Sequence, residues 1–176
     1  ILGSSGSPIR MMIKKYPFSL SVVSGLLLSL PWLLMGYSWV LFIAFVPLLF
    51  AELLIEKTRP EKGSFAFFKV AFPAFFIWNV LSTWWIAYVS VGGMLSIALL
   101  NSIVMSVVWS LRHRINRPIK EAYPFFLLSA FWLTFEFLHY HWSLQWPWLN
   151  LGNGLANFVK FIQWYEYTGV LGGSLW

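Results

Sequence analysis

The chain has 176 residues, of which 59% are hydrophobic, 20% aromatic and 10% charged, and its mean hydropathy is +0.71. Because soluble proteins carry about 25% charged residues, this composition excludes an ordinary soluble domain and predicts an integral membrane protein. The chain contains no cysteine and no aspartate, which excludes disulfides, thiolate metal sites and a cysteine nucleophile within these residues. We therefore expect neither a metal site nor a cofactor here.

The first residues, 1–12, are predicted to be flexible or artefactual. The chain begins with Ile1, and Met11 and Met12 stand just before a basic pair. We interpret one of these methionines as the true start, and the residues before it as a translation artefact or a cloning remnant. A secretory signal peptide is the competing interpretation. We prefer a retained first helix, because no small-residue cleavage motif follows the first apolar run and further apolar runs do.

Apolar runs long enough to cross about 30 Å of hydrocarbon recur along the chain. Turns or charged loops separate them, and Pro31 is expected to kink or end the first run. The predicted fold class is an all-α integral membrane protein, a polytopic helical bundle with five complete transmembrane helices plus the start of a sixth. The five runs occupy residues 18–34, 39–55, 65–89, 94–111 and 123–140 within a membrane region 13–141, and the sixth helix begins in residues 168–176.

The basic residues identify the cytoplasmic side of the predicted bundle. With a cytoplasmic N-terminus, eleven of the twelve Lys and Arg residues fall in cytoplasmic segments, and Lys160 falls outside. This distribution explains the net charge of +6 as a topology signal and excludes a nucleic-acid partner. The cytoplasmic set is Arg10, Lys14, Lys15, Lys57, Arg59, Lys62, Lys69, Arg112, Arg114, Arg117 and Lys120.

Polar residues within the runs are expected to form hydrogen bonds between neighbouring helices, worth about 0.6 kcal/mol each. They are Asn79, Ser82, Thr83, Asn101, Ser102 and Ser106. Glu136 is different, since a carboxylate at membrane depth costs on the order of 3 kcal/mol unless it is paired or protonated. It shares a helix face with His139 and Tyr140. Two roles stay open for it: a structural tether at the interface, or a contact to a substrate headgroup or a partner domain. His113 is interpreted as a loop cation.

Residues 142–167 are too broken by Pro147 and by glycines to span a bilayer. They are predicted to form an extracytoplasmic aromatic and glycine-rich loop followed by an interfacial helix. Asn153 can cap that helix, and from Leu155 onward apolar side chains recur on one face. An ordinary loop with chance periodicity is the alternative. The tryptophans of this stretch fit a membrane rim and would also suit the wall of a lipid groove; they are Trp142, Trp146 and Trp148.

Four sequence features occur in an order found in one known family. The first is Trp84-Trp85-Ile86-Ala-Tyr88-Val-Ser90 followed by Gly92-Gly93, and the second is Trp132 with Glu136 four residues later. The third is Trp146-Pro147-Trp148-Leu149 with Gly152, and the fourth is Gln163 with Gly169, Gly172 and Ser174. Together they resemble the apolipoprotein N-acyltransferase family, and the resemblance covers residues 14–176. In that family the first feature is similar to the end of the third span. The other three resemble the family motifs Trp-x-x-x-Glu, Pro-Trp-Leu-x-x-Gly and Gln…Gly-x-x-Gly-x-Ser, in that order. Asn153-Gly154 departs from the aromatic residue and Gln of many members.

The resemblance implies a bacterial inner-membrane enzyme of lipoprotein maturation, with residues 142–167 in the periplasm. In that family a nitrilase-like domain with a Glu-Lys-Cys triad follows, so catalytic residues are expected beyond Trp176 and none is assigned here. The chain is therefore interpreted as an N-terminal fragment that is inactive alone. The implied partners are a phospholipid acyl donor, a diacylglyceryl-modified apolipoprotein and the lipid bilayer. Candidates for lipid, substrate or domain-docking contacts are Trp85, Tyr88, Glu136, His139, Trp146, Trp148, Asn150, Asn153 and Gln163.

A non-enzymatic small polytopic membrane protein, such as a transporter subunit or a lipid-handling scaffold, is the alternative. The lack of catalytic residues and the polar positions in the third and fourth runs favour it. A terminus inside a predicted helix and the lack of a charge pathway through the membrane disfavour it.

Overall fold

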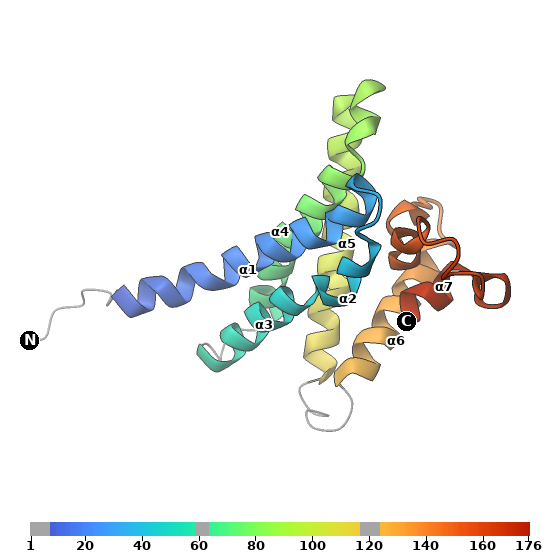
Figure 1. Ribbon diagram of the computed structural model, residues 1–176. Helices are drawn as coiled ribbons and strands as arrows, with labels where there is room; N and C mark the ends of the chain where they lie inside the picture. The colour runs from blue at the N-terminus through green and yellow to red at the C-terminus, as the bar shows by residue number, and fades with distance from the viewer. Residues whose placement is uncertain (1–7, 59–63, 117–123) are drawn as a thin grey trace, which may run out of the picture.

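The computed structural model describes residues 8–58, 64–116 and 124–176, and the regular secondary structure in these ranges is entirely helical. In Figure 1 the first half of α1 extends to the left beyond the other helices, while α6 and α7 lie together on the right. The elements are α1 (Pro8–Leu33), η1 (Ser38–Val40), α2 (Leu41–Ala44), α3 (Val46–Thr58), α4 (Ser64–Ser82), η2 (Trp84–Tyr88), α5 (Val91–Asn116), α6 (Pro124–His139), η4 (Pro147–Leu149), η5 (Leu151–Leu155) and α7 (Tyr165–Leu175).

Four helical stretches in the described residues are long and apolar enough to cross a membrane. A further apolar helix, Phe126–His139, is shorter. The predicted helical membrane bundle is thus confirmed, whereas the count of five complete spans plus a sixth is not. The four stretches are Tyr16–Leu33, Ser38–Lys57, Phe65–Ser82 and Val91–Arg114.

Some predicted boundaries differ from those of the structure. The first run ends close to Pro31, as expected: α1 finishes at Leu33, and the amide of Leu34 bonds to the Leu30 carbonyl at 2.8 Å. Residues 8–12 belong to α1, and residues 1–7 lie outside the described residues, so the interpretation of residues 1–12 as flexible or artefactual stays a prediction. The third run ends as an α-helix at Ser82 and continues as the separate 3₁₀ helix η2.

The two ends of the bundle differ in chemistry, and we name them accordingly. The aromatic end is where α1 and α4 finish and where η2, η4 and η5 lie. The basic end is where α3 and α5 finish and where α4 and α6 begin. Since consecutive long helices run back and forth between these ends, residues far apart in sequence meet at each of them.

An aromatic core holds the helices together. Trp132 of α6 is buried among rings of α4 and the α2–α3 junction: its ring centroid lies 5.2 Å from Phe45, 5.5 Å from Phe75 and 6.3 Å from Trp78. Such aromatic pairs contribute about 0.5–1.5 kcal/mol beyond their burial. The buried cluster is completed by Leu28, Ala44, Leu48, Ala71, Ala74, Met105, Trp109, Phe135 and Leu149.

Small residues allow α1 to approach α4 closely. A Cβ atom on Gly25 would lie 2.6 Å from the carbonyl oxygen of Ala74, so only glycine fits this crossing. Ser21 donates a hydrogen bond to the Val70 carbonyl of α4, and Ser24 donates to the Ala44 carbonyl of α2 at 2.6 Å. Small and hydroxyl residues at a helix contact are the usual means of helix association in membranes.

The predicted hydrogen bonds between helices are only partly present. Asn101 of α5 donates to the side-chain oxygen of Asn79 on α4 at 2.8 Å, as expected. Thr83, Ser102 and Ser106 instead donate to the carbonyl four residues earlier along the chain. A hydroxyl on a helix can always reach that carbonyl, so it does not need a partner on another helix. The prediction was therefore wrong for these three residues.

Replacing Asn101 with leucine is expected to lower the free energy of unfolding by about 1 kcal/mol, because the buried Asn79 oxygen loses its donor. Ser102→Ala is the matched control on the same helix: it removes only a bond within α5, and we expect a change within about 0.5 kcal/mol. Unfolding of both variants in mixed detergent micelles measures the difference. Equal losses for the two variants would contradict the assignment.

A buried ionic cluster joins α3 to α5 near the basic end. The Glu52 carboxylate accepts a hydrogen bond from the Arg112 guanidinium and lies 2.6 Å from Nδ1 of His113, and all three side chains are buried. The interpretation of His113 as a loop cation was wrong. Helix α5 continues through Asn116, which places His113 inside the bundle with its ring stacked on Phe67.

Candidate functional site

Glu136 is the centre of a polar cluster at the aromatic end. Its side chain is 1% exposed, and Oε1 accepts hydrogen bonds from Nε1 of Trp132 at 2.9 Å and from the backbone amide of Leu151 at 2.8 Å. One carboxylate thus ties α6 to η5. These contacts are those of a structural tether, which is one of the two roles left open for Glu136; a contact to a substrate headgroup or a partner domain is the other.

Gly152 attaches this cluster to α7. Its amide donates to Oγ of Ser174 at 2.9 Å, and its carbonyl accepts a bond from the Tyr165 hydroxyl at 2.8 Å. A Cβ on Gly152 would lie 2.1 Å from the carbonyl oxygen of Val170. The contact between η5 and α7 therefore requires a residue without a side chain. The Ser174 hydroxyl also lies next to the Glu136 carboxyl group, which closes the cluster.

Tyr165 lies in the first turn of α7, and its hydroxyl stays protonated and donates a hydrogen bond. Burial, and secondarily the negative charge of Glu136, raises the pKa of its phenol to about 12. The hydroxyl therefore keeps its proton, and its bond to the Gly152 carbonyl, at any physiological pH. Tyr165 was not among the predicted site residues, since it falls in the run after Leu155 that was expected to form an interfacial helix.

The cluster brings together three of the motifs noted in the sequence. Trp132 and Glu136 come from α6, Gly152 from η5, and Ser174 from α7. The hydrogen bonds among them explain why Trp and Glu stand four residues apart and why glycine and serine are needed. Four residues make one helical turn, so the indole and the carboxylate meet on one face.

Two exposed tryptophans, Trp85 and Trp148, and the partly buried Trp146 form a second feature of the aromatic end. The rings of Trp85 in η2 and Trp148 in η4 meet edge to face at 5.8 Å, and Trp146 lies 6.4 Å from Trp148. The Trp148 carbonyl accepts a bond from Nε1 of Trp32 at the end of α1. We call Trp85, Trp146 and Trp148 the aromatic surface. Tyr88 does not join it: this side chain is 82% exposed and packs on Trp84.

The other predicted site residues have structural contacts. His139 is buried between the rings of Phe135 and Trp142. Asn150 is buried, and its backbone carbonyl accepts a bond from the amide of Asn153 at 2.9 Å.

Asn153 and Gln163 bond locally and do not reach the Glu136 cluster through any described bond. The Asn153 side chain donates to the Pro147 carbonyl at 2.7 Å, which holds the loop closed. Gln163 is exposed and donates to the Val159 carbonyl, within its own turn.

The predicted interfacial helix from Leu155 is not formed. Residues 156–164 are a series of turns, with bonds of 2.8 Å from the amide of Phe158 to Leu155 and from the amide of Phe161 to Phe158. Asn153 therefore does not cap an α-helix, because the next α-helix, α7, begins only at Tyr165. The reason is tertiary: the chain must turn back here so that α7 can pack on η5, which a continuous helix would prevent.

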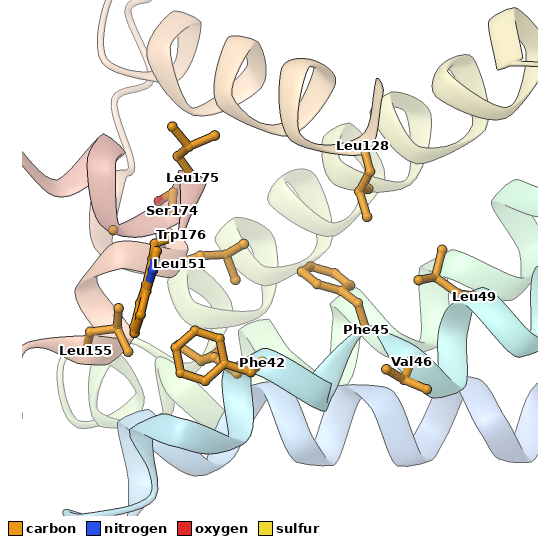
Figure 2. Close-up of a pocket in the computed structure, with 12 residues that line it drawn as sticks. Phe42, Phe45, Val46, Leu49, Leu128, Leu151, Leu155, Ser174, Leu175 and Trp176 are labelled. Atoms are coloured by element: carbon orange, nitrogen blue, oxygen red, sulfur yellow. The ribbon is translucent and has the colours of Figure 1, made fainter. Parts of the chain in front are cut away.

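An apolar groove lies beside the polar cluster, between the α2–α3 segment, α6, η5 and α7 (Figure 2). Its volume is about 280 Å³, and apart from the Ser174 hydroxyl and the indole N–H of Trp176 the side chains that line it are apolar. Such a groove suits an alkyl chain, because it offers few partners to a polar ligand. The remaining lining residues are Leu41, Phe42, Phe45, Val46, Leu49, Leu128, Leu151, Leu155, Gly173, Leu175 and Trp176.

Comparison with known proteins agrees with the motifs assembled in this cluster. The family model described as "Apolipoprotein N-acyltransferase N-terminal domain" matches residues 24–176. The chain is also 28% identical, over 179 aligned residues, to the apolipoprotein N-acyltransferase of Chlorobaculum tepidum, covering 97% of this chain and 31% of that protein. It thus spans about a third of the length of this curated relative. No solved structure matches the chain. Because the family model covers most of its residues, the chain belongs to the family of apolipoprotein N-acyltransferase N-terminal domains.

Proposed function

We propose that this chain is the membrane-embedded part of an enzyme that transfers an acyl chain from a phospholipid to the N-terminal diacylglyceryl-cysteine of bacterial apolipoproteins. The family match over residues 24–176 carries this proposal. The apolar groove beside Ser174 supports it, because a lipid-handling enzyme needs a place for an alkyl chain.

The proposed chemistry takes place outside this chain. The chain has no cysteine, and the relative is about three times as long, which leaves room for a catalytic domain. There a Cys thiolate would attack the phospholipid ester carbonyl and release a lysophospholipid, leaving an acyl thioester. The α-amino group of the diacylglyceryl-cysteine would then attack the thioester and regenerate the thiol. Glu would act as general base, and Lys would stabilise the oxyanion.

We propose the following arrangement in a bacterial inner membrane. The N-terminus is cytoplasmic, α6 is the fifth span, and residues 168–176 enter a sixth. The basic end then faces the cytoplasm, in keeping with the positions of the Lys and Arg residues. Residues 142–167 face the periplasm and present the aromatic surface to the catalytic domain or to a lipid headgroup. Reporter fusions after residue 157 and after residue 116 test this arrangement, which fails if the first is cytoplasmic.

The alternative of a transporter subunit loses part of one support. Of the polar positions in the third and fourth runs, Asn79 and Asn101 bond to each other, and Ser102 bonds within its own helix. Such bonds stabilise helix contacts and need no passing solute. The Ser82 hydroxyl and Oδ1 of Asn101 are buried without a hydrogen-bond partner among the described residues.

The groove is expected to hold the acyl chain of a bound phospholipid. A phospholipid with a diazirine near the end of one chain should label peptides containing Leu128 or Leu175, which line the groove. Leu128→Trp fills the groove and should reduce this labelling about fivefold or more. Phe126→Trp is the matched control: Phe126 lies on the same helix, is 69% exposed and does not line the groove.

The same preparation tests the proposed activity. The 176-residue chain alone should transfer no acyl group to a synthetic diacylglyceryl-cysteine peptide in vesicles, whereas the chain extended by its proposed catalytic domain should do so. Acyl transfer by the 176-residue chain alone would overturn the proposal that catalysis takes place in a domain outside it. Equal labelling in the Leu128→Trp and Phe126→Trp variants would overturn the role of the groove.

A further inference from the structure

A second groove lies at the basic end, between the start of α4 and the end of α5. Its volume is about 370 Å³, and it shares no residue with the groove in Figure 2. It opens on the side of the bundle where α4 begins at Ser64, whereas the Glu136 cluster lies at the aromatic end. The lining residues are Phe65, Phe68, Val107, Ser110, Leu111 and Arg114.

The wall of this groove suits an extended hydrocarbon chain. Phe65 and Phe68 stack at 6.0 Å with an interplanar angle of 12°, and the stack continues along α4 through Phe72 and Phe76 at 5.9 Å and 5.6 Å. Across the groove, Val107 of α5 is 51% exposed. This ring stack follows the axis of α4, a helix long enough to cross the membrane, and an acyl chain in the same membrane has a similar orientation.

One cation lines the groove and a second contacts its wall. Arg114 is exposed and lines it, and the ammonium of Lys69 lies 4.6 Å from the ring centroid of Phe65, which also lines it. The ion pairs found among the described residues use Arg112 and His113 with Glu52 and involve neither of these cations. Two arginines of the same helix end thus differ: Arg112 is buried and paired with Glu52, whereas Arg114 is exposed and has no ion pair among the described residues.

We propose that this groove binds an anionic phospholipid from the leaflet at the basic end. One acyl chain would lie along Phe65 and Phe68, and the phosphate would lie between Arg114 and Lys69. A guanidinium holds phosphate oxygens through paired N–H donors. In a zwitterionic lipid the choline ammonium is repelled by the same two cations and offsets their attraction for the phosphate, so the site discriminates by headgroup charge. This inference does not depend on the proposed acyl transfer.

Lipid binding to the full chain in detergent, measured by native mass spectrometry, tests the proposal. Phosphatidylglycerol and phosphatidylcholine with identical chains are compared on the unaltered protein and on four variants. We expect phosphatidylglycerol to bind at least fivefold more tightly. Arg114→Gln and Lys69→Gln should each weaken its binding about fivefold, the contribution of one cation near a membrane surface, and leave phosphatidylcholine unaffected. Val107→Trp fills the groove and should weaken both lipids.

Lys160→Gln is the charge-matched control, since Lys160 is an exposed cation of the 156–164 turns, outside this groove. It should change neither affinity. Equal binding of the two lipids, or equal losses in Lys160→Gln and Arg114→Gln, would overturn the proposal. Full competition by inorganic phosphate would also overturn it, because it would indicate a simple anion site. A change from dimer to monomer in Val107→Trp would overturn it too, because it would indicate that a second copy of the chain occupies the groove.

Discussion

Glu52→Ala is expected to lower the free energy of unfolding by about 3–5 kcal/mol, the usual cost of removing one partner from a buried ion pair. The substitution leaves the Arg112 guanidinium buried between α3 and α5, 4.7 Å from the Trp109 ring, without its carboxylate. His113 loses its only acidic neighbour among the described ion pairs while its ring stays stacked on Phe67. Unfolding in mixed micelles measures the loss.

Two controls separate the ion pair from a general loss of a carboxylate. Glu166→Ala removes an exposed carboxylate in the first turn of α7, and we expect a change within about 0.5 kcal/mol. The double variant Glu52→Leu with Arg112→Met removes both charges and fills similar volumes. It should recover most of the stability, because an apolar replacement of a whole buried pair is often neutral. A double variant as unstable as Glu52→Ala would contradict this account.

Gly152→Ala is expected to cost about 3 kcal/mol, at the upper end of the range for overpacking. The new methyl group would lie 2.1 Å from the Val170 carbonyl oxygen, and backbone atoms cannot rotate away as a side chain does. Relief requires η5 to separate from α7, which breaks the bonds of Gly152 to Ser174 and Tyr165. The turns at 156–164 would then be exposed, so limited proteolysis in this segment should become at least tenfold faster.

Gly92→Ala is the matched control for this prediction. Around Gly92 the nearest atom to an added Cβ is the Ser90 hydroxyl oxygen at 4.0 Å, so alanine fits without movement. Because alanine is also the better helix former, Gly92→Ala in α5 should be neutral or slightly stabilising. If the two glycine variants were proteolysed at the same rate, the close approach of η5 and α7 would not be what holds the turns in place.

The sequence by itself determined the class of the protein and much of its local structure. Long apolar runs leave α-helix as the only simple way to satisfy backbone hydrogen bonds in lipid, so the existence and order of α1, α4 and α5 could be predicted, although several of their ends could not. The motif around Glu136 could be recognised for a related reason, since a four-residue spacing places Trp132 and Glu136 on one helix face. These are properties of single helices.

Only the tertiary structure decided which distant groups meet. Nothing within α3 or α5 indicates that Glu52 bonds to Arg112 and His113, because the partners are about 60 residues apart. The apolar spacing after Leu155 predicted a helix, but the packing of α7 on η5 requires turns there. Local periodicity reports which face of a segment is apolar; it carries no information on when the chain must reverse. That depends on the free energy of contacts such as Tyr165 with Gly152, which form only once the helices have assembled.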